Sequence, residues 1–344
     1  MLKDAIKIGE KTIGEKSPTY IIAEIGSNHN RDISIAKKMI DEASIAGVDA
    51  VKFQTFKAES LYSKNTPKFS KDSVTPFDLI KSIELPRNWQ KKLFDYAISK
   101  NLDFISSPFD YDAVDELDKI GVPAFKVASF EIVDIELLKY IGEKQKPVII
   151  STGMANIEEI KEALNAIKST GNKDIILLHC NSLYPSSPEI VNLKAIETMK
   201  KVFKVPIGFS DHTVGIHISL AAVAKGAKLI EKHFTLNREM PGPDHSFAIE
   251  PYELQNLVKS IRDIEKAEGD GVKDKSKDEQ EMYEKGRRSI IAYKDISKGT
   301  EITRDMLVVK RPGFGIKPKY INEIIGREAK VDIKSDQWIT WDMV

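Results

Sequence analysis

The chain has 344 residues, enough for one barrel domain of about 250 residues and a small additional domain. Lysine plus arginine and aspartate plus glutamate number 52 each, so bulk charge gives no reason to expect a nucleic-acid or membrane-surface partner. The single cysteine excludes an intramolecular disulfide, and the opening MLKDAIKIGEK lacks the apolar core of a signal peptide, so we expect a cytoplasmic protein.

The first predicted element is a hairpin over Ile6–Ile13, where apolar and polar residues alternate around Gly9. Eight short apolar runs follow, separated by segments with the apolar spacing of helices. The runs are Tyr20–Ile25, Ala50–Gln54, Phe104–Phe109, Ala124–Ser129, Pro147–Thr152, Asp174–Asn181, Pro206–His212 and Lys228–Phe234. This alternation predicts an α/β fold, a (β/α)₈ TIM barrel over residues 1–268 with the hairpin at its floor. Its active site is expected at the carboxyl ends of the strands.

Two stretches depart from this alternation. About thirty residues, Lys57–Pro86, separate the second strand from its helix, and connections of that length are usually lids or binding loops. Residues 269–286 are charged and poor in apolar side chains, which predicts a partly helical linker; a solvated helix of the barrel is the alternative. Residues 287–344 carry short β-branched runs and a turn at Ser297–Gly299, which predicts a small β-rich domain.

Two histidines end neighbouring strands of the predicted barrel. Side chains two apart on a strand point the same way, so Glu231 shares a face with His233, and Ser210 with His212. Two imidazoles can bind one cation and leave positions open for substrate and water. We expect a divalent metal there, Mn²⁺ before Co²⁺ or Mg²⁺, because Mn²⁺ or a similar ion fits a site of imidazole and oxygen ligands better than Ca²⁺ does. A hydrogen-bonded pair of core histidines is the alternative.

Lys52 and Lys126 end two other strands, and four hydroxyls are expected around them, from Ser107, Ser129, Ser151 and Ser210. Two ammonium groups with several hydroxyls suit a ligand that carries both phosphate and carboxylate, such as phosphoenolpyruvate. A buried lysine can instead form a Schiff base, so an aldolase or lyase that uses Lys126 is the chemical alternative.

Glu24 is the one carboxylate of the first strand near the centre. It is available as a general base or to stabilise positive charge at a reacting carbon, although it could merely pair a lysine. Cys180 has no base partner evident in the sequence, and we interpret it as a small core residue.

Nine segments occur in a specific order from Ile21 to Gly313: IIAEIGSNHN, DAVKFQTF, FISSPFD, FKVASFE, STGM, GFSDHT, EKHFTL, GPDH and VVKRPG. In this order the sequence resembles the sialic acid synthase family, with VVKRPG in its C-terminal antifreeze-like (SAF) domain. The resemblance implies condensation of phosphoenolpyruvate with an N-acetylhexosamine and water, which gives a nine-carbon nonulosonic acid and phosphate. The hexosamine would be N-acetylmannosamine or a related 6-deoxy or diacetamido sugar.

The resemblance also implies roles for particular residues. The catalytic residues would be Glu24, Lys52, Lys126 and Glu231, with Glu231 supporting the shell of a metal held by His212 and His233. The phosphoenolpyruvate contacts would be the two lysines with Ser107, Ser129, Ser151 and Ser210. The sugar side would be lined by Gln54, Asn181, Ser182, Tyr184 and Asp244. Arg311 would enter the partner's barrel in a domain-swapped homodimer.

Some positions depart from the family's pattern. Arg31 stands where a glycine commonly follows the NHN triplet, and Ser182 where some members have asparagine. RPGFGIKPKY resembles the pseudaminic acid synthase branch, whereas KFQTF and GPDHSF resemble the sialic or legionaminic branches, so the sequence leaves the sugar open. A non-catalytic sugar- or ice-binding protein is a further alternative, against which the eight polar strand ends argue.

Overall fold

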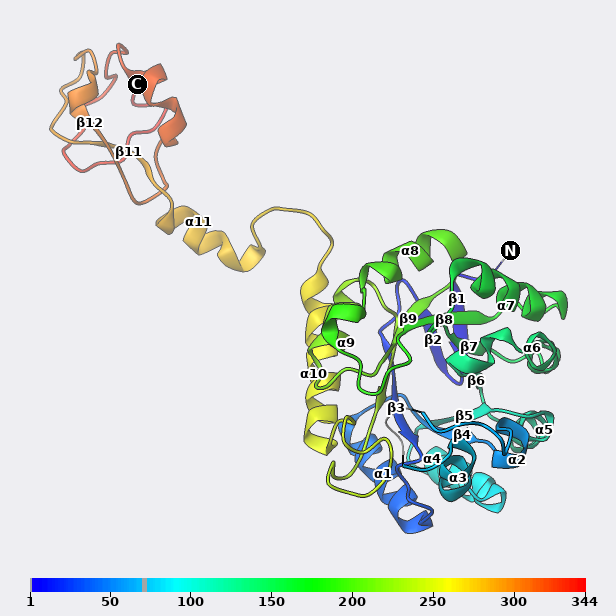
Figure 1. The fold of residues 1–344 in the computed structure, drawn as a ribbon. Helices are drawn as coiled ribbons and strands as arrows, with labels where there is room; N and C mark the ends of the chain where they lie inside the picture. Colours follow the sequence, from blue (N-terminus) through cyan, green and yellow to red (C-terminus); the bar gives the residue numbers. More distant parts are fainter. Residues whose placement is uncertain (1, 70–72) are drawn as a thin grey trace. The chain divides into compact units, whose positions relative to one another are not determined.

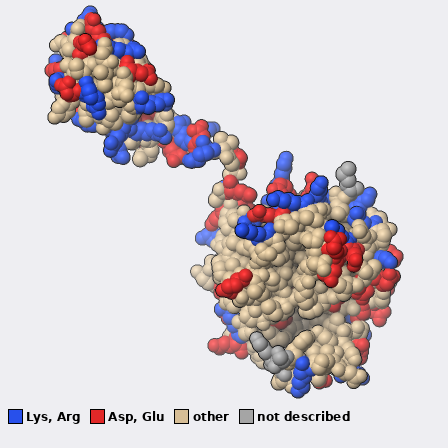
Figure 2. Space-filling model, turned by 45° about the horizontal axis from the view of Figure 1, so that its top comes forward, with Lys and Arg blue, Asp and Glu red and all other residues tan. Residues whose placement is uncertain are grey.

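The computed structural model describes residues 2–69 and 73–344 (Figure 1). The chain divides into two compact units, Met1–Gly269 and Asp270–Val344. On the face of the first unit seen in Figure 2, charged residues lie mostly toward the margin and uncharged residues cover much of the middle. Among the described residues, no helix is long and apolar enough to cross a membrane.

The first unit is built on eight parallel strands that close into a barrel in the order β10-β3-β4-β5-β6-β7-β8-β9. Their bounds are β3 Tyr20–Gly26, β4 Ala50–Thr55, β5 Asp103–Pro108, β6 Phe125–Val127, β7 Val148–Ser151, β8 Ile175–Cys180, β9 Ile207–Asp211 and β10 Leu229–His233. The predicted (β/α)₈ barrel is therefore confirmed. Strands β6 to β10 are each shorter than the predicted runs, and β6 is the most reduced because the chain turns at Ser129 into a 3-10 helix, η2 (Ser129–Val133).

Helices surround the barrel: α1 Ile33–Ala46, α4 Gln90–Ser99, α5 Tyr111–Ile120, α6 Ile135–Glu143, α7 Ile157–Ser169, α8 Lys194–Phe203, α9 His217–Ala224 and α10 Pro251–Glu268. Local sequence fixes their ends. In α7, the Asn156 side chain accepts from the backbone of Glu158 and Glu159, and Glu159 bonds back to Asn156, which completes a capping box. Gly47 ends α1 in the left-handed conformation that glycine adopts without a steric cost.

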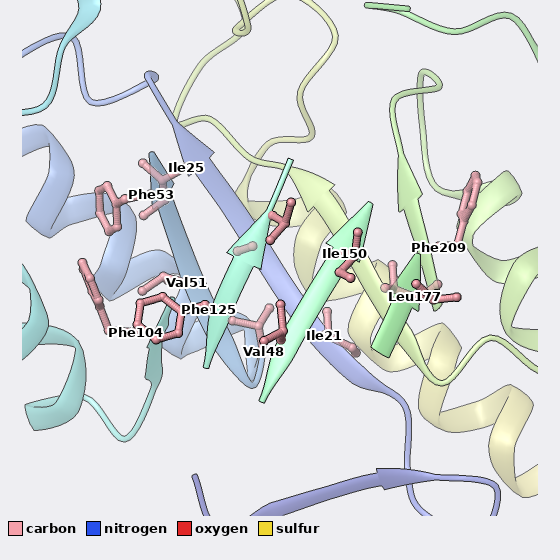
Figure 3. Close-up of a cluster of buried hydrophobic side chains, with 14 of the residues drawn as sticks. Ile21, Ile25, Val48, Val51, Phe53, Phe104, Phe125, Ile150, Leu177 and Phe209 are labelled. Atoms are coloured by element: carbon pink, nitrogen blue, oxygen red, sulfur yellow. The ribbon is translucent and has the colours of Figure 1, made fainter. Parts of the chain in front are cut away.

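The outer core lies between strands and helices. Outward-pointing strand residues such as Ile21, Phe53, Phe104, Phe125 and Ile150 belong to one fully buried apolar cluster (Figure 3). This alternation of outward and inward side chains is the physical reason why every second strand position is apolar regardless of function.

The barrel floor is closed by the predicted hairpin. Strands β1 (Ala5–Ile8) and β2 (Lys11–Gly14) pair antiparallel, and Ile6, Ile8 and Ile13 are at most 1% exposed. They belong to a second apolar cluster with inward-facing strand residues near the amino ends: Ile22, Ala50, Ile105, Ala124, Ile149, Ile176, Leu178 and Leu229.

The long connection after β4 contains two short helices, α2 (Ala58–Leu61) and α3 (Pro76–Ile83), before the 3-10 turn η1 (Arg87–Trp89) that leads into α4. Thr75 caps α3 by accepting from the Asp78 backbone, and Pro76 occupies the first turn, where its missing N–H costs nothing. The apolar face of α3 borders a cavity described below.

The second unit begins with exposed residues and the helical segments η4 (Lys277–Glu279) and α11 (Gln280–Gly286). It continues with β11 (Ser289–Ala292) and β12 (Leu307–Lys310), which pair antiparallel, and with the short helices η5 (Arg304–Met306), η6 (Pro318–Tyr320) and α12 (Ile321–Ile324). Its own buried cluster includes Ile290, Ile302, Ile324 and Ile339, so the unit has a separate core. The predicted turn is present, since the Thr300 backbone donates to the Ser297 carbonyl.

Candidate active site

The carboxyl ends of the strands enclose a small, mostly polar cavity of about 50 Å³, which we call the inner cavity. It is lined by Glu24, Lys52, Gln54, Ser107, Phe109, Lys126, Ala128, Ser129, Ser151, Cys180, Tyr184, Ser210, His212, Glu231 and His233. Twelve of these side chains were singled out as site residues from the sequence, and the barrel brings them together from all eight strands or the turns that follow them.

Glu24 and Lys52 form a buried ion pair at one side of the inner cavity. The Lys52 Nζ lies 2.8 Å from Glu24 Oε2, and the Gln54 amide donates to Glu24 Oε1 at 2.7 Å. Burial raises the pKa of Glu24 even though Lys52 opposes the shift. Burial alone would lower the pKa of Lys52, but Glu231 and Glu24 more than offset this and leave it raised. The lysine therefore stays charged, and the buried Glu24 carboxylate takes up a proton more readily than an exposed glutamate does.

Lys126 lies across the cavity, where its ammonium group donates to Ser151 Oγ at 2.7 Å and to the Val127 carbonyl at 3.0 Å. Burial lowers the pKa of Lys126, and Glu231 counteracts that only in part. The Glu231 carboxylate lies 3.8 Å from the Lys52 Nζ and 3.9 Å from the Lys126 Nζ, and it accepts from Ser210 at 3.0 Å. Its pKa stays low despite burial because two ammonium groups face it.

The two histidines have neighbouring rings whose centroids are 5.3 Å apart. His212 Nδ1 lies 2.8 Å from the Asn181 carbonyl, which can only accept, so Nδ1 carries a proton and Nε2 is the ring nitrogen that remains to face a ligand. His233 Nδ1 is buried, has no hydrogen-bond partner in the part of the chain that the structure describes, and lies 3.9 Å from Asp244 Oδ2. Burial and then the charge of His212 lower the pKa of His233, so it is neutral. Among the described residues, no hydrogen bond joins the two imidazoles to each other, although His212 bonds to the Asn181 carbonyl.

A buried ion pair on the outer side of the same strands braces both histidines. Asp211 and Lys232 each precede a histidine, are at most 1% exposed, and lie 3.0 Å apart. Asp211 also accepts from the backbone and hydroxyl of Thr213 at 2.8 Å, and from Ser219. The pair therefore joins β9 to β10 directly behind the imidazoles.

The loop after β3 contacts the loop after β10 at the carboxyl end of the barrel, and we call these contacts the mouth clasp. Ser27 donates to Asp244 at 3.3 Å, and His245 Nε2 lies 3.0 Å from the Asn30 amide oxygen. His29 is buried and accepts from the Arg31 backbone at 3.0 Å, which requires its Nδ1 to be unprotonated. Burial, with Arg31 adding to it, lowers the pKa of His29 to about 4. These contacts hold the Asp244 carboxylate at the edge of the inner cavity.

Arg31, the residue that replaces a glycine of the family pattern, has φ of 55°, in the left-handed region. A glycine adopts this conformation freely, whereas other residues are strained in it. The replacement of glycine by arginine at this position therefore affects the conformational strain of the backbone.

A second, larger cavity of about 430 Å³, which we call the outer cavity, adjoins the first and shares Gln54, Ser129, Tyr184 and His233 with it. One wall is apolar and comes from the long connection after β4 and from the strand ends, with Phe56, Leu61, Leu79, Ile80, Ile83 and Phe109. Asp244 and Glu131 also line it.

The structure places four further assigned residues as follows. Glu231, which the resemblance places in support of the metal shell, lies beside the two lysines and Ser210. Asn181 faces the histidine through its backbone carbonyl, while its side chain donates to the Ile190 carbonyl. Ser182 has a buried hydroxyl near Gly153 and Ser129. Arg311 lies in the second unit, after β12, and is exposed.

Cys180 was interpreted as a small core residue, and this was incomplete. Its thiol lines the inner cavity, 3.8 Å from His212 Nδ1 and 3.6 Å from Ser129 Oγ. Alternation along β8 could have revealed it, because Leu178, two residues earlier, faces the barrel interior. Glu131 was missed altogether, since it sits in a 3-10 helix rather than at a strand end.

Comparison with known proteins identifies the family. Residues 39–273 match the NeuB family, and residues 287–344 match the SAF domain. The N,N'-diacetyllegionaminic acid synthase of Campylobacter jejuni is 45% identical over 93% of this chain and 98% of its own length. Human N-acetylneuraminate-9-phosphate synthase is 37% identical over 96% and 94%. A crystal structure of N-acetylneuraminic acid synthetase from Leptospira borgpetersenii, in complex with citrate, superposes with a TM-score of 0.74 and 38% identity over 81% of this chain and 95% of that one.

The chain belongs to the NeuB family of sialic, legionaminic and pseudaminic acid synthases, enzymes that condense phosphoenolpyruvate with a sugar. The resemblance drawn from the motifs is thereby confirmed, as is the small β-rich SAF domain after the barrel. The relatives' names differ in the sugar, so they leave the substrate of this chain open.

Proposed function

We propose that the protein condenses phosphoenolpyruvate with an N-acetylated hexosamine and water, giving a nine-carbon nonulosonic acid and phosphate. The sugar is N-acetylmannosamine or a related 6-deoxy or diacetamido sugar. The observation that carries the proposal is the pair of buried lysines, Lys52 and Lys126, set among serine hydroxyls in the inner cavity. Phosphate and carboxylate on one small ligand need such matched charges once water is excluded.

The histidine pair fits a divalent cation. The Asn181 carbonyl fixes His212 with its Nε2 free, which is how metal-binding imidazoles are usually oriented, and His233 is neutral and has an orphaned buried nitrogen. No cluster of three or more His, Cys, Asp and Glu residues suited to a metal occurs in the part of the chain described, so substrate and water would complete the coordination. When bound, such an ion, Mn²⁺ before Co²⁺ or Mg²⁺, supplies Lewis-acid polarisation of the sugar's open-chain aldehyde.

The remaining steps depend on the protein's own residues. Carbon 3 of phosphoenolpyruvate attacks the aldehyde carbon, and carbon 2 becomes a cationic oxocarbenium centre. The carboxylate of Glu24 stabilises that charge and takes a proton as water adds to carbon 2, a role that suits its raised pKa. Lys52 and Lys126 hold the anionic groups. The tetrahedral intermediate loses phosphate by cleavage of its carbon–oxygen bond, and no covalent lysine is needed.

Phosphate release from phosphoenolpyruvate in the presence of N-acetylated hexosamines and Mn²⁺ tests the proposal. Chelation should abolish turnover, and added Mn²⁺ or Co²⁺ should restore it. His233→Ala should be inactive yet folded, while His217→Ala, which changes an exposed histidine on α9, should match the wild type. Trapping with pyruvate and borohydride would label Lys126 only in a Schiff-base aldolase or lyase. Full activity of chelator-treated, metal-free enzyme would contradict the metal assignment.

We also propose a two-fold dimer in which the SAF domain brings Arg311 to the partner's barrel, as the family resemblance implies. Glu24→Ala and Arg311→Ala homodimers should each be nearly inactive. After mixing and complete exchange, half the dimers are heterodimers with one intact site of two, so about a quarter of wild-type activity should return. If mixing restores nothing although exchange is verified, Arg311 acts within its own subunit.

A further inference from the structure

The outward face of strands β9 and β10 changes from apolar to charged just before the two histidines. Phe209 and Ile230 are partners across the ladder on this face, and both belong to the buried apolar cluster between strands and helices. The next outward positions, two residues further along each strand, hold Asp211 and Lys232. These two are again direct partners in the register, and each is at most 1% exposed. A buried ion pair thus continues a face whose preceding residues are apolar.

Stability alone gives little reason for an ion pair at this place. Two charges are costly to remove from water, and apolar side chains of similar volume often replace a buried pair with no loss of stability. A buried pair is better explained where it holds the chain in one particular arrangement. Here Asp211 makes further specific contacts, since it accepts from the backbone N–H and the hydroxyl of Thr213 and from the hydroxyl of Ser219 on α9. The pair therefore fixes the turn that follows β9.

His212 lies in that turn, beyond the backbone ladder between β9 and β10. The ladder ends at Asp211 and Lys232, whereas His233 is still paired with β3. The ion pair holds the residues on both sides of His212 instead. The Lys232 ammonium group donates to the Thr213 carbonyl at 2.5 Å and lies 3.0 Å from the Asp211 carboxylate. Lys232 therefore links the strand that carries one histidine to the turn that carries the other.

We propose that the Asp211–Lys232 pair positions the two histidines relative to each other and thereby sets the affinity of their site for a divalent cation. Both imidazoles must direct a nitrogen at one ion, and their ring centroids are 5.3 Å apart. A shift of the turn after β9 would move His212 and leave His233 in place, so the two nitrogens would no longer converge. Groups that hold metal ligands in place typically contribute about 10–100-fold to metal affinity. The inference rests on the proposed function, because it requires a cation between the histidines.

A double variant separates positioning from stability. Asp211→Leu with Lys232→Met replaces the ion pair by apolar side chains of similar size, and it should unfold in urea at the wild-type midpoint or above. Its dissociation constant for Mn²⁺, at the site that His233→Ala removes, should rise about 10–100-fold. The EPR signal of free Mn²⁺ measures this constant without substrates, so the result does not depend on turnover.

Phe209→Leu is the matched control, because it changes the preceding outward position of the same strand. It removes packing behind the site but leaves the ion pair intact. The urea midpoint of this variant should fall, and its dissociation constant for Mn²⁺ should equal that of the wild type.

Lys232→Met alone tests the link between strand and turn with a milder change, since Asp211 keeps its donors from Thr213 and Ser219. Its dissociation constant for Mn²⁺ should rise about tenfold. The Mn²⁺ concentration that gives half-maximal activity should rise by a similar factor, while the KM of phosphoenolpyruvate at saturating Mn²⁺ stays unchanged.

These measurements distinguish a failure of the inference from a failure of the proposed function. If the wild-type protein does not bind Mn²⁺, the metal assignment in the proposed function is wrong, and the inference fails with it. If the wild type binds Mn²⁺ and both folded ion-pair variants bind it equally well, the inference alone is wrong. A double variant that does not fold, or an equal loss of Mn²⁺ affinity in Phe209→Leu, would also overturn it, because the pair would then act only through the stability of the barrel.

Discussion

The two ends of the barrel use the same inward-facing positions for opposite purposes. Near the amino ends these positions hold Ile22, Ala50, Ile105, Ala124, Ile149 and Leu229, all of them buried among apolar neighbours and the hairpin. Two residues further along the same strands, the positions hold Glu24, Lys52, Ser107, Lys126, Ser151 and Glu231. One step of strand periodicity thus separates a layer that stabilises the fold from a layer whose charges are expensive to bury.

The largest effect on activity should come from the layer of charged and polar residues at the carboxyl ends of the strands, which we call the upper layer. Lys126→Met keeps the side-chain length but removes a charge that would bind the phosphate or carboxylate, so kcat/KM should fall by about 10²–10³. The KM for phosphoenolpyruvate should rise more than that for the sugar. Because burial already lowers the pKa of Lys126, its ammonium adds little to stability, and the variant should still unfold cooperatively. Unchanged kinetics for phosphoenolpyruvate would contradict the role of this lysine.

The apolar layer near the amino ends, which we call the lower layer, should show the reverse: its substitutions should reduce stability and leave substrate binding unchanged. Ile105→Ala should lower the free energy of unfolding by about 2–5 kcal/mol, because it leaves a cavity beneath the site, while KM values of the folded enzyme stay unchanged. Ser107→Ala is its partner on the same face of β5; the Ser107 hydroxyl lies 3.5 Å from the Lys52 Nζ. It should impair turnover and change stability little. Denaturant unfolding and steady-state kinetics of both variants test the difference between the two layers. If Ile105→Ala and Ser107→Ala change stability and turnover to a similar extent, the two layers do not differ as proposed.

The two layers also differ in how far the sequence could predict them. Residues at strand ends were predictable because an eight-strand parallel barrel places all carboxyl ends on one face. Glu131, the apolar wall of the outer cavity and the clasp through His245 were not predictable from periodicity, because each depends on how a loop folds back over the barrel. The resemblance gave Glu231 a role beside the metal, and only the closed barrel shows that its carboxylate also lies 3.8 Å and 3.9 Å from the two lysine ammonium groups.

The mouth clasp lies above both layers, and its contribution to the free energy of unfolding should depend on pH. His29 has a folded-state pKa of about 4, below its ordinary value, so the folded protein resists its protonation. Its contribution to stability is complete above pH 6.5 and is lost as the pH falls toward 4, by about 3 kcal/mol in total. His29→Gln, which retains a hydrogen-bond acceptor, should remove this component. Urea unfolding of both proteins between pH 7 and pH 4 measures it, and parallel curves would contradict the assignment.

The smallest effect is expected at Arg31, beside His29. With φ at 55°, the arginine is strained in the folded state by about 1–2 kcal/mol relative to glycine. A glycine there would enlarge the entropy of the unfolded chain, which offsets the gain by about 0.4–1 kcal/mol. Arg31→Gly should therefore raise the free energy of unfolding at pH 7 by at most about 1.6 kcal/mol.

The charge of Arg31 predicts how the stabilisation by Arg31→Gly changes with pH. Arg31 contributes to the low pKa of His29, so its removal lets the folded protein tolerate a protonated His29 better. The stabilisation by Arg31→Gly should accordingly be larger at pH 4.5 than at pH 7, and this pH difference should vanish in the double variant with His29→Gln. Urea unfolding at the two pH values measures the coupling. A loss of stability at both values would show that the arginine side chain, and not the backbone, decides the conformation of this turn.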